Sequence, residues 1–314
     1  MKNQNNKIIV ISGATATGKT EISIELAKKI DGEIVSADSM LVYKHMDIGT
    51  AKPTKEEMEG IPHHLIDVVE PKEIFSAKDF VKLADKSISD ILKRGKIPIV
   101  VGGTWLYIQA LLFGLSEAPE GDWELRESLY KKSNEELYKL LEKVDKEYAC
   151  KIHKNDKKRI IRALEVYYAT GKPFSQFQKE HRFKEKRYDF IGFNFERDRD
   201  EIMERIELRI EKMFEKGLVE EVKNLMDMGY ENFITSLQAI GYKEVIPYVK
   251  GEINLQTAKH NLIKNTKSFA KRQLRTFRNK FEFENINLSN YTKGEVLDKI
   301  INNTEWRKTD VNTG

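Results

Sequence analysis

One stretch near the N-terminus has the residues of a phosphate-binding loop. GATATGKT matches the pattern G-x-x-x-x-G-K-[ST] at every position. The matching residues are Gly13, Ala14, Thr15, Ala16, Thr17, Gly18, Lys19 and Thr20. In such a loop the backbone N–H groups and a helix N-terminus surround phosphate oxygens, Lys19 adds a full positive charge, and the Thr20 hydroxyl is placed to bind Mg²⁺. The motif predicts a site for a di- or triphosphate and leaves open whether the phosphates belong to a nucleotide.

The acid that usually helps to hold Mg²⁺ beside such a loop stands on a different strand here. The apolar run IPIVV at 97–101 predicts a strand, but it is followed by Gly102 to Thr104 rather than by Asp. Asp38 instead follows the strand predicted at 33–36. Because the carboxyl ends of parallel strands meet at one edge of a sheet, we expect Asp38 to lie close to the phosphate loop.

Two side chains at these strand ends each have a functional and a structural interpretation. Asp38 would orient Mg²⁺ or accept a proton from a nucleophile, although Asp-Ser is also common in turns. Thr104 would aim its hydroxyl at a phosphate or at the acceptor, or it would cap the helix predicted at 105–113. For Asp38 the position after the strand favours the functional role.

Apolar runs and helical stripes alternate along the chain and predict an α/β fold. We expect strands at 7–12, 33–36, 64–69, 97–101, 188–195 and 281–288. We expect helices at 19–30, 77–94, 105–113, 198–227, about 236–250 and 257–280. The stretch 116–187 is polar and helix-rich without a β-type run, which predicts a helical insertion domain. Outside the insertion, we expect residues 1–115 and 188–314 to form a P-loop NTPase-like core with a parallel sheet and basic C-terminal helices. The polar C-terminal end is expected to fray.

Composition restricts the class of protein. The chain has 314 residues, of which 40% are hydrophobic, so it has room for a large core and is not disordered as a whole. A single cysteine, Cys150, excludes a disulfide framework and a Cys-based zinc site. The sequence has neither a secretory h-region nor an apolar stretch of about 18 residues, and we expect a cytoplasmic protein.

The net charge of +4 conceals an uneven distribution. Residues 257–280 contain eight Lys and Arg but no Asp or Glu. Residues 151–187 contain twelve Lys and Arg against four acids, with aromatic residues such as Tyr167 and Phe174 interleaved. Basic side chains meet phosphates and aromatic rings stack on unpaired bases, so these segments indicate an RNA partner. A solvated helix face is the alternative.

Several longer motifs carry a resemblance to a known family. They are GATATGKT (13–20), ADSMLVYKHMDIGTAKP (37–53), IPHHLID (61–67), VGGTWLY (101–107), KRIIRALEVYYATGK (158–172), QAIGYKE (238–244) and AKRQLRTFRN (270–279). With them the chain resembles the tRNA dimethylallyltransferases, or tRNA isopentenyltransferases, over about residues 7–285, and is similar to the shorter bacterial type. Three positions depart from the residues usual in the family: Ala14 stands in place of Pro, Thr17 in place of Ser or Ala, and Leu41 in place of Gln. Unlike Gln, Leu41 has no polar side-chain atom with which to read a base.

The resemblance implies a reaction and roles for particular residues. A dimethylallyl group would pass from dimethylallyl diphosphate to N6 of the adenine immediately 3′ of the anticodon, with Mg²⁺ as cofactor and pyrophosphate released. Asp38 would be the base, Thr104 would line the acceptor and leaving-group site, and Arg209 would steady pyrophosphate. Arg205 lies four residues earlier on the same helix face and is the weaker candidate; surface pairing with Glu201, Glu204 or Glu207 is the alternative for both arginines.

The same resemblance implies contacts with the tRNA anticodon stem-loop. The matching residues are Asp38, Ser39, Met40, Leu41, Arg126, Lys158, Arg159, Ile160, Ile161, Arg162, Gln238, Ala239, Ile240, Gly241, Tyr242 and Lys243. We expect the chain to act as a monomer without membrane contact.

Other functions are compatible with parts of this pattern. A P-loop kinase would use Asp38 as a base toward a hydroxyl group. A non-catalytic RNA-binding protein would use the phosphate loop as a nucleotide switch. An adenylate isopentenyltransferase shares the loop and related motifs but needs no basic RNA surface, so the helical insertion and the basic segment 257–280 favour tRNA as acceptor.

Overall fold

The chain forms two compact units. The computed structural model describes residues 7–181, 186–230 and 239–303. One unit, here called the core unit, comprises residues 1–112 and 187–314, and the other, the insertion unit, comprises 113–186. The insertion predicted from the sequence runs from 116 to 187.

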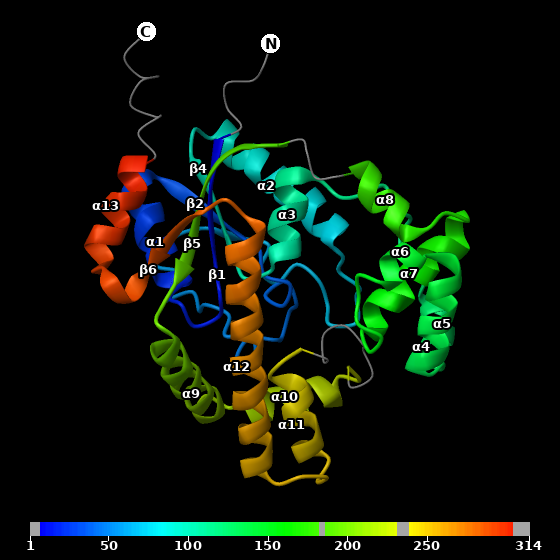
Figure 1. Cartoon of the computed structure of the whole chain (residues 1–314). Helices are drawn as coiled ribbons and strands as arrows, with labels where there is room; N and C mark the ends of the chain where they lie inside the picture. The colour runs from blue at the N-terminus through cyan, green and yellow to red at the C-terminus, as the bar shows by residue number, and fades with distance from the viewer. Residues whose placement is uncertain (1–6, 182–185, 231–238, 304–314) are drawn as a thin grey trace. The chain divides into compact units, whose positions relative to one another are not determined.

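A six-stranded sheet forms the centre of the core unit (Figure 1). Its strands are β1 (Lys7–Gly13), β2 (Gly32–Ser36), β3 (His63–His64), β4 (Ile97–Gly102), β5 (Asp189–Glu196) and β6 (Glu284–Asn287). Their order is β3-β2-β4-β1-β5-β6, and every pairing is parallel. The predicted α/β fold with a parallel sheet is therefore confirmed, and the carboxyl ends of β1, β2, β4 and β5 meet at one edge.

Helices cover both faces of this sheet (Figure 1). The helices on the two faces are α1 (Lys19–Ile30), α2 (Ala77–Lys93), α3 (Trp105–Phe113), α12 (Leu255–Lys280) and α13 (Lys293–Asn303), with a short 3₁₀ helix, η1 (Leu288–Asn290). Helices α9 (Arg199–Glu215), α10 (Leu218–Asp227) and α11 (Tyr242–Val249) lie beyond the strand ends and pack on one another and on α12. Helices α1 and α13 pack with the sheet in one apolar core. A second core joins the loop after β1 to α9, α10, α11 and α12.

The strand expected at 64–69 is wrong beyond its first residue. Strand β3 contains only His63 and His64, paired with β2. Leu65 and Asp67 then adopt left-handed backbone angles, with φ of 63° and 56°, which cannot continue an extended strand. Val69 afterwards forms a single parallel bridge. Apolar residue types alone do not reveal such a break.

The helical C-terminal half differs in detail from the prediction. The helix expected over 198–227 is two helices, because Gly217 has φ +97° between α9 and α10. Helix α11 begins at Tyr242, and 231–238 lie outside the described residues. Helix α13 was not predicted from the sequence, although Thr292 and Glu295 form a capping pair before it and its apolar residues recur at helical spacing. The end predicted to fray, from 304, also lies outside the described residues.

Within the described residues, every regular element of the insertion unit is a helix. It contains α4 (Trp123–Tyr130), α5 (Asn134–Val144), α6 (Lys146–Ala149), α7 (Lys157–Thr170) and α8 (Phe174–His181). Leu129, Leu137, Leu141 and Leu164 are among the residues of its own apolar core. The unit therefore has the internal packing of a separate domain.

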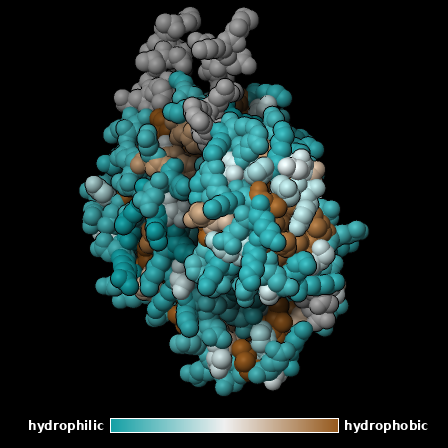
Figure 2. Space-filling model, turned by 45° about the vertical axis from the view of Figure 1, so that its right-hand side comes forward, coloured by the Kyte–Doolittle hydropathy of each residue, from teal (hydrophilic) through white to brown (hydrophobic). Residues whose placement is uncertain are grey.

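Most of the visible surface is hydrophilic, and hydrophobic side chains are scattered over it in small groups (Figure 2). The most exposed large apolar side chains include Leu208 on α9 and Met228 after α10. Among the described helices, none combines the length and the apolar character that crossing a membrane requires.

Candidate active site at the phosphate loop

The loop between β1 and α1 has the shape that its motif predicts. Gly18 adopts φ +98° and Ala16 φ +64°, so the backbone turns sharply before the helix begins. The Thr17 hydroxyl donates to the Ala14 carbonyl at 2.9 Å, and the Lys19 ammonium donates to the same oxygen at 2.6 Å. The first N–H groups of α1 have no partner within the helix and are available to an anion.

Two arginines support the loop from outside. Arg197, which follows β5, donates through Nε to the Thr17 carbonyl at 2.7 Å. Arg205 on α9 donates through Nε to the Ala16 carbonyl at 2.9 Å. Glu201 lies 2.5 Å from the guanidinium of Arg197 and 3.8 Å from that of Arg205. The alternative of a glutamate partner thus holds in part for Arg205, which also braces the loop.

Arg209 occupies a different position from Arg205. Its guanidinium donates to the Thr15 hydroxyl at 3.4 Å and to the Thr50 carbonyl at 3.3 Å. Within the described residues, no carboxylate lies within ion-pair distance of it, which leaves its charge available to an anion. Burial lowers its pKa, and the nearby Asp38 carboxylate opposes that shift.

Lys19, Arg209 and Asp38 form one electrostatic group. Burial lowers the pKa of Lys19 to about 8, the Asp38 charge acts in the opposite direction, and Arg209 lowers it further. The expected proximity of Asp38 to Lys19 is therefore found. Two cations and one carboxylate leave a positive excess, which suits a diphosphate.

Gly102 allows the segment that carries Asp38 to lie against the end of β4. A Cβ on Gly102 would lie 2.1 Å from the Ala37 carbonyl oxygen, so a side chain there would displace the segment that carries Asp38. The Ala37 N–H donates to the Val101 carbonyl at 2.8 Å and its carbonyl accepts from the Thr104 N–H at 3.2 Å. One oxygen of Asp38 accepts from the Met40 N–H at 2.9 Å, so the carboxylate also shapes its own turn. The segment that carries Asp38 thus passes beside the end of β4, the strand that in a common P-loop enzyme is followed by the Asp that helps to hold Mg²⁺.

Thr104 links this turn to the end of β4. Its hydroxyl accepts from the Ser39 N–H at 3.1 Å and donates to the Ser39 hydroxyl at 3.3 Å. Its carbonyl accepts the first N–H bonds of α3, so the backbone lies at the predicted helix start. The hydroxyl bonds Ser39 and thereby holds the residue that follows Asp38.

Thr20 and Asp38 offer oxygen atoms suited to Mg²⁺. Thr20 is exposed on the first turn of α1, and its hydroxyl has no hydrogen-bond partner among the described residues. Hydroxyl and carboxylate oxygens are ligands that Mg²⁺ accepts. The described part of the chain contains no cluster of three or more His, Cys, Asp or Glu side chains able to hold a metal ion. The residues present therefore fit a cation that also shares oxygens of a bound phosphate.

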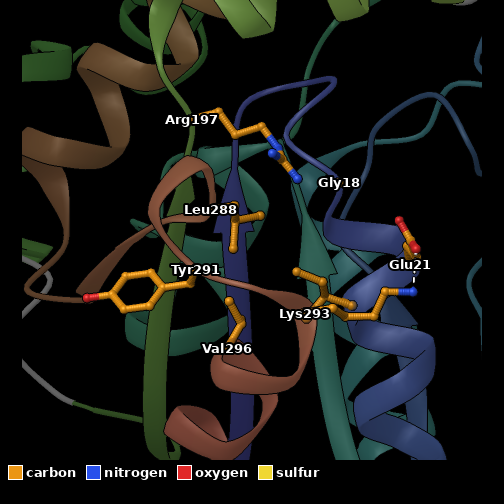
Figure 3. Close-up of a pocket in the computed structure, with 8 residues that line it drawn as sticks. Gly18, Glu21, Arg197, Leu288, Tyr291, Lys293 and Val296 are labelled. Atoms are coloured by element: carbon orange, nitrogen blue, oxygen red, sulfur yellow. Dashed lines mark ion pairs between the residues drawn. The ribbon is translucent and has the colours of Figure 1, made fainter.

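A small cavity lies beside the start of α1, and Asp38 is not among its lining residues (Figure 3). Its volume is about 60 Å³, enough for water but not for a substrate. Arg197 points toward Gly18 at one end, and Lys293 pairs with Glu21 at 2.5 Å at the other (Figure 3). The C-terminal segment thereby packs behind the start of α1.

The predicted tRNA contacts in the insertion unit have different environments. Lys158 and Arg159 are exposed at the start of α7, whereas Ile160 and Ile161 are buried in the unit's core. Arg126 and Arg162 both bond the fully buried Glu165, at 2.8 Å and 2.5 Å.

The predicted contacts at 238–243 adjoin the 46–50 loop. Gln238 lies outside the described residues. Ala239, Ile240 and the exposed Lys243 flank Gly241 and Tyr242, which are buried. The Tyr242 hydroxyl donates to Glu221 at 2.7 Å, and Glu221 also accepts the N–H groups of residues 47, 48 and 49 at 2.7–3.0 Å.

Comparison with known proteins agrees with this geometry. The model of the family described as IPP transferase matches residues 41–280. The chain belongs to the IPP transferase family. It is 62% identical to the tRNA dimethylallyltransferase of Sulfurihydrogenibium sp., over 98% of this chain and 100% of that protein. It is 52% identical to the tRNA dimethylallyltransferase of Aquifex aeolicus, over 94% and 96%.

Solved structures support the same assignment. The tRNA isopentenylpyrophosphate transferase of Staphylococcus epidermidis is 43% identical, with a TM-score of 0.72 over 96% of this chain and 99% of that one. A eukaryotic dimethylallyltransferase described as acting on tRNA is 33% identical, with a TM-score of 0.74 over 87% and 70%.

Three residues of this IPP transferase site were missed from the sequence. Arg197 had a signal, since it directly follows a strand that neighbours the phosphate-loop strand. Gln273, from α12, bonds the loop itself; its signals are a polar residue within an apolar helical stripe and its place in the motif at 270–279. Glu221 had no signal, because its partners are backbone N–H groups distant in sequence.

Proposed function

We propose that this chain transfers a dimethylallyl group from dimethylallyl diphosphate to N6 of the adenine immediately 3′ of the anticodon in tRNA, releasing pyrophosphate. The observation that carries the proposal is the convergence of Lys19, Arg209 and Asp38 at a complete phosphate loop. Membership of the IPP transferase family and 62% identity to a tRNA dimethylallyltransferase support it.

The diphosphate would occupy the cationic side of this group. As the allylic C–O bond breaks, its electron pair goes to the diphosphate oxygen, and positive charge develops on the prenyl carbon. Lys19, Arg209 and the first N–H groups of α1 would stabilise the growing negative charge. Lys19 now bonds the Ala14 carbonyl and would exchange that partner for a phosphate oxygen.

Asp38 would act on the acceptor. The exocyclic amine of adenine is a weak nucleophile because its lone pair is delocalised into the ring. As the N–C bond forms, the amine proton would pass to the free carboxylate oxygen of Asp38. Thr104 and Ser39 hold that carboxylate's turn in place. The adenine must leave its stack to reach the site.

Mg²⁺ would be held by Thr20 and by diphosphate oxygens. When bound it supplies charge neutralisation of the leaving group. The chain's own residues contribute Lys19 and Arg209 to the same task.

Basic surfaces in each unit would bind the anticodon stem-loop. In the core unit, the ammonium groups of Lys259 and Lys267 and the guanidinium of Arg278 pair with acids of α9 and β5. The other five basic residues of α12 form no ion pair within the described residues; they are Lys264, Lys271, Arg272, Arg275 and Lys280. In the insertion unit, Lys158 and Arg159 are exposed. These charges would meet RNA phosphates, with one copy of the chain acting on one tRNA.

One experiment separates this function from its alternatives. The protein is incubated with Mg²⁺, dimethylallyl diphosphate and either tRNA or AMP, and the nucleosides are examined by mass spectrometry after digestion. We expect one C5 prenyl unit on an adenosine of tRNA and none on AMP. Prenylated AMP would indicate an adenylate isopentenyltransferase, ATP consumption without prenylation a kinase, and binding without product an RNA-binding protein.

A further inference from the structure

Gln273 is a polar residue on the buried face of α12. It lies between Ala270 and Phe277 in an otherwise apolar stripe and is 8% exposed. A buried amide costs free energy unless its donor and acceptor are both paired. Its partners therefore indicate what the residue does.

Both ends of the amide are paired with backbone groups of the active site. The oxygen accepts from the Thr15 N–H at 2.9 Å, and the nitrogen donates to the Gly103 carbonyl at 2.8 Å. Because an N–H only donates and a carbonyl only accepts, the two partners fix the orientation of the amide. A Cβ on Gly103 would lie 2.5 Å from the Gln273 nitrogen, so the glycine makes room for this bridge.

The bridge joins the two halves of the site. On one side, the Thr15 hydroxyl accepts a hydrogen bond from Arg209, which under the proposed function would hold the diphosphate. On the other, Gly103 precedes Thr104, whose hydroxyl holds Ser39 beside Asp38. Gln273 thus spans the gap between the groups that would hold the leaving group and the turn that carries the base.

We propose that Gln273 is a positioning residue for prenyl transfer: its side-chain amide fixes the phosphate loop against the end of β4 and so sets the separation between the donor diphosphate and Asp38. The inference rests on the proposed function. Misplacement of reacting groups by about 1 Å costs on the order of 100-fold in rate, so loss of such a bridge has a kinetic consequence. The bridge also gives the Thr15 N–H, a backbone donor of the phosphate loop, its hydrogen-bond partner.

Two variants distinguish this role from simple filling of space. Gln273→Met keeps a side chain of similar length and removes both hydrogen bonds. Gln273→Glu keeps the shape, and its protonated carboxyl reproduces both bonds, since its C=O accepts and its O–H donates. The ionised form cannot donate to the Gly103 carbonyl and places a negative charge beside the diphosphate site. Thr276→Val is the control on the same helix, because the Thr276 hydroxyl bonds only the Arg272 carbonyl within α12.

The measurement is kcat and the donor KM of each variant divided by the wild-type values at each pH from 5.5 to 8.5. We expect Gln273→Met to lower kcat/KM for the donor about 10- to 100-fold at every pH, with the tRNA Kd within a few-fold of wild type. We expect Gln273→Glu to lose at least as much at pH 8, where the carboxyl is ionised. Because burial raises the pKa of a carboxyl, we expect part of the loss to be recovered as the pH falls toward 5.5. Division by the wild type cancels titrations that both proteins share.

A Gln273→Met protein with wild-type kinetics, or a Gln273→Glu ratio that is the same at all pH values, would overturn the proposal. If Gln273→Met does not fold, the comparison of Gln273→Glu with itself at two pH values still decides. Failure of the wild type to prenylate tRNA would instead contradict the proposed function, before any variant is made.

Discussion

At the scale of single residues, the site depends on which charges are already paired. Arg205 and Arg209 lie four residues apart on one helix, so sequence spacing cannot separate them. In the structure Arg205 bonds the Ala16 carbonyl, whereas Arg209 reaches Thr15 and has no carboxylate partner among the described residues. The position of Asp38 close to the phosphate loop could be predicted, because the carboxyl ends of parallel strands converge. The role of Gln273 could not, because the motif that contains it, at 270–279, does not show which of its residues bonds the phosphate loop.

Lys19 gives a pH dependence that follows from its burial. Its pKa is about 8 in the free protein, and a bound diphosphate would raise it. Binding above pH 8 must therefore take up a proton, so we expect the donor KM to be constant from pH 6.5 to 7.5 and to rise by up to about tenfold per pH unit above 8. Lys19→Arg is the control, because arginine stays charged and its donor KM should be flat. A wild-type donor KM that does not change up to pH 9.5 would contradict this assignment.

At the scale of elements, each strand end places one part of the site, and the opposite end of the sheet holds a separate ion cluster. Glu33, 1% exposed on β2, accepts hydrogen bonds from Arg94 and His64, both at 2.8 Å. Strand positions and the parallel sheet could be predicted from apolar runs. The early end of β3 could not, since left-handed angles at Leu65 and Asp67 are not encoded in apolar residue types.

Glu33 makes stability depend on pH in a defined window. Its hydrogen bonds with Arg94 hold its pKa at about 2, below the ordinary 4.5, so its stabilisation is present above pH 4.5 and is lost as pH falls toward 2. Because Arg94 is about half exposed, we expect Glu33→Gln to lower the free energy of unfolding by roughly 1–3 kcal/mol at pH 7. Chemical denaturation at pH 7 and pH 3 tests this, with the surface variant Glu25→Gln as control. An equal effect at both pH values would refute the assignment.

At the scale of the whole molecule, the net charge of +4 is a sum of basic segments and an acidic remainder. The sequence could show that residues 257–280 lack acids. It could not show that acids of α9 and β5 neutralise three of the basic residues, because those contacts join segments far apart in the chain.

This pairing predicts which α12 charges bind RNA. We expect the double variant Lys271→Gln/Arg275→Gln to raise the tRNA Kd and to reduce the slope of log K against log salt by about 1.4–1.8, leaving the donor KM unchanged. Lys259→Gln/Lys267→Gln removes the same charge from the same helix, but these ammonium groups are already paired with α9, so its effect should be clearly smaller. Equal salt slopes for the two double variants would argue against this surface.

The central claim is that Asp38 takes the amine proton at a site where Lys19 and Arg209 hold the diphosphate. It is tested most directly by the single-turnover rate of prenyl transfer with Asp38→Asn, using saturating tRNA, dimethylallyl diphosphate and Mg²⁺. We expect a rate about 10²- to 10⁴-fold below that of the wild type, with the tRNA Kd changed no more than a few-fold. A variant that transfers the prenyl group at the wild-type rate would contradict the account.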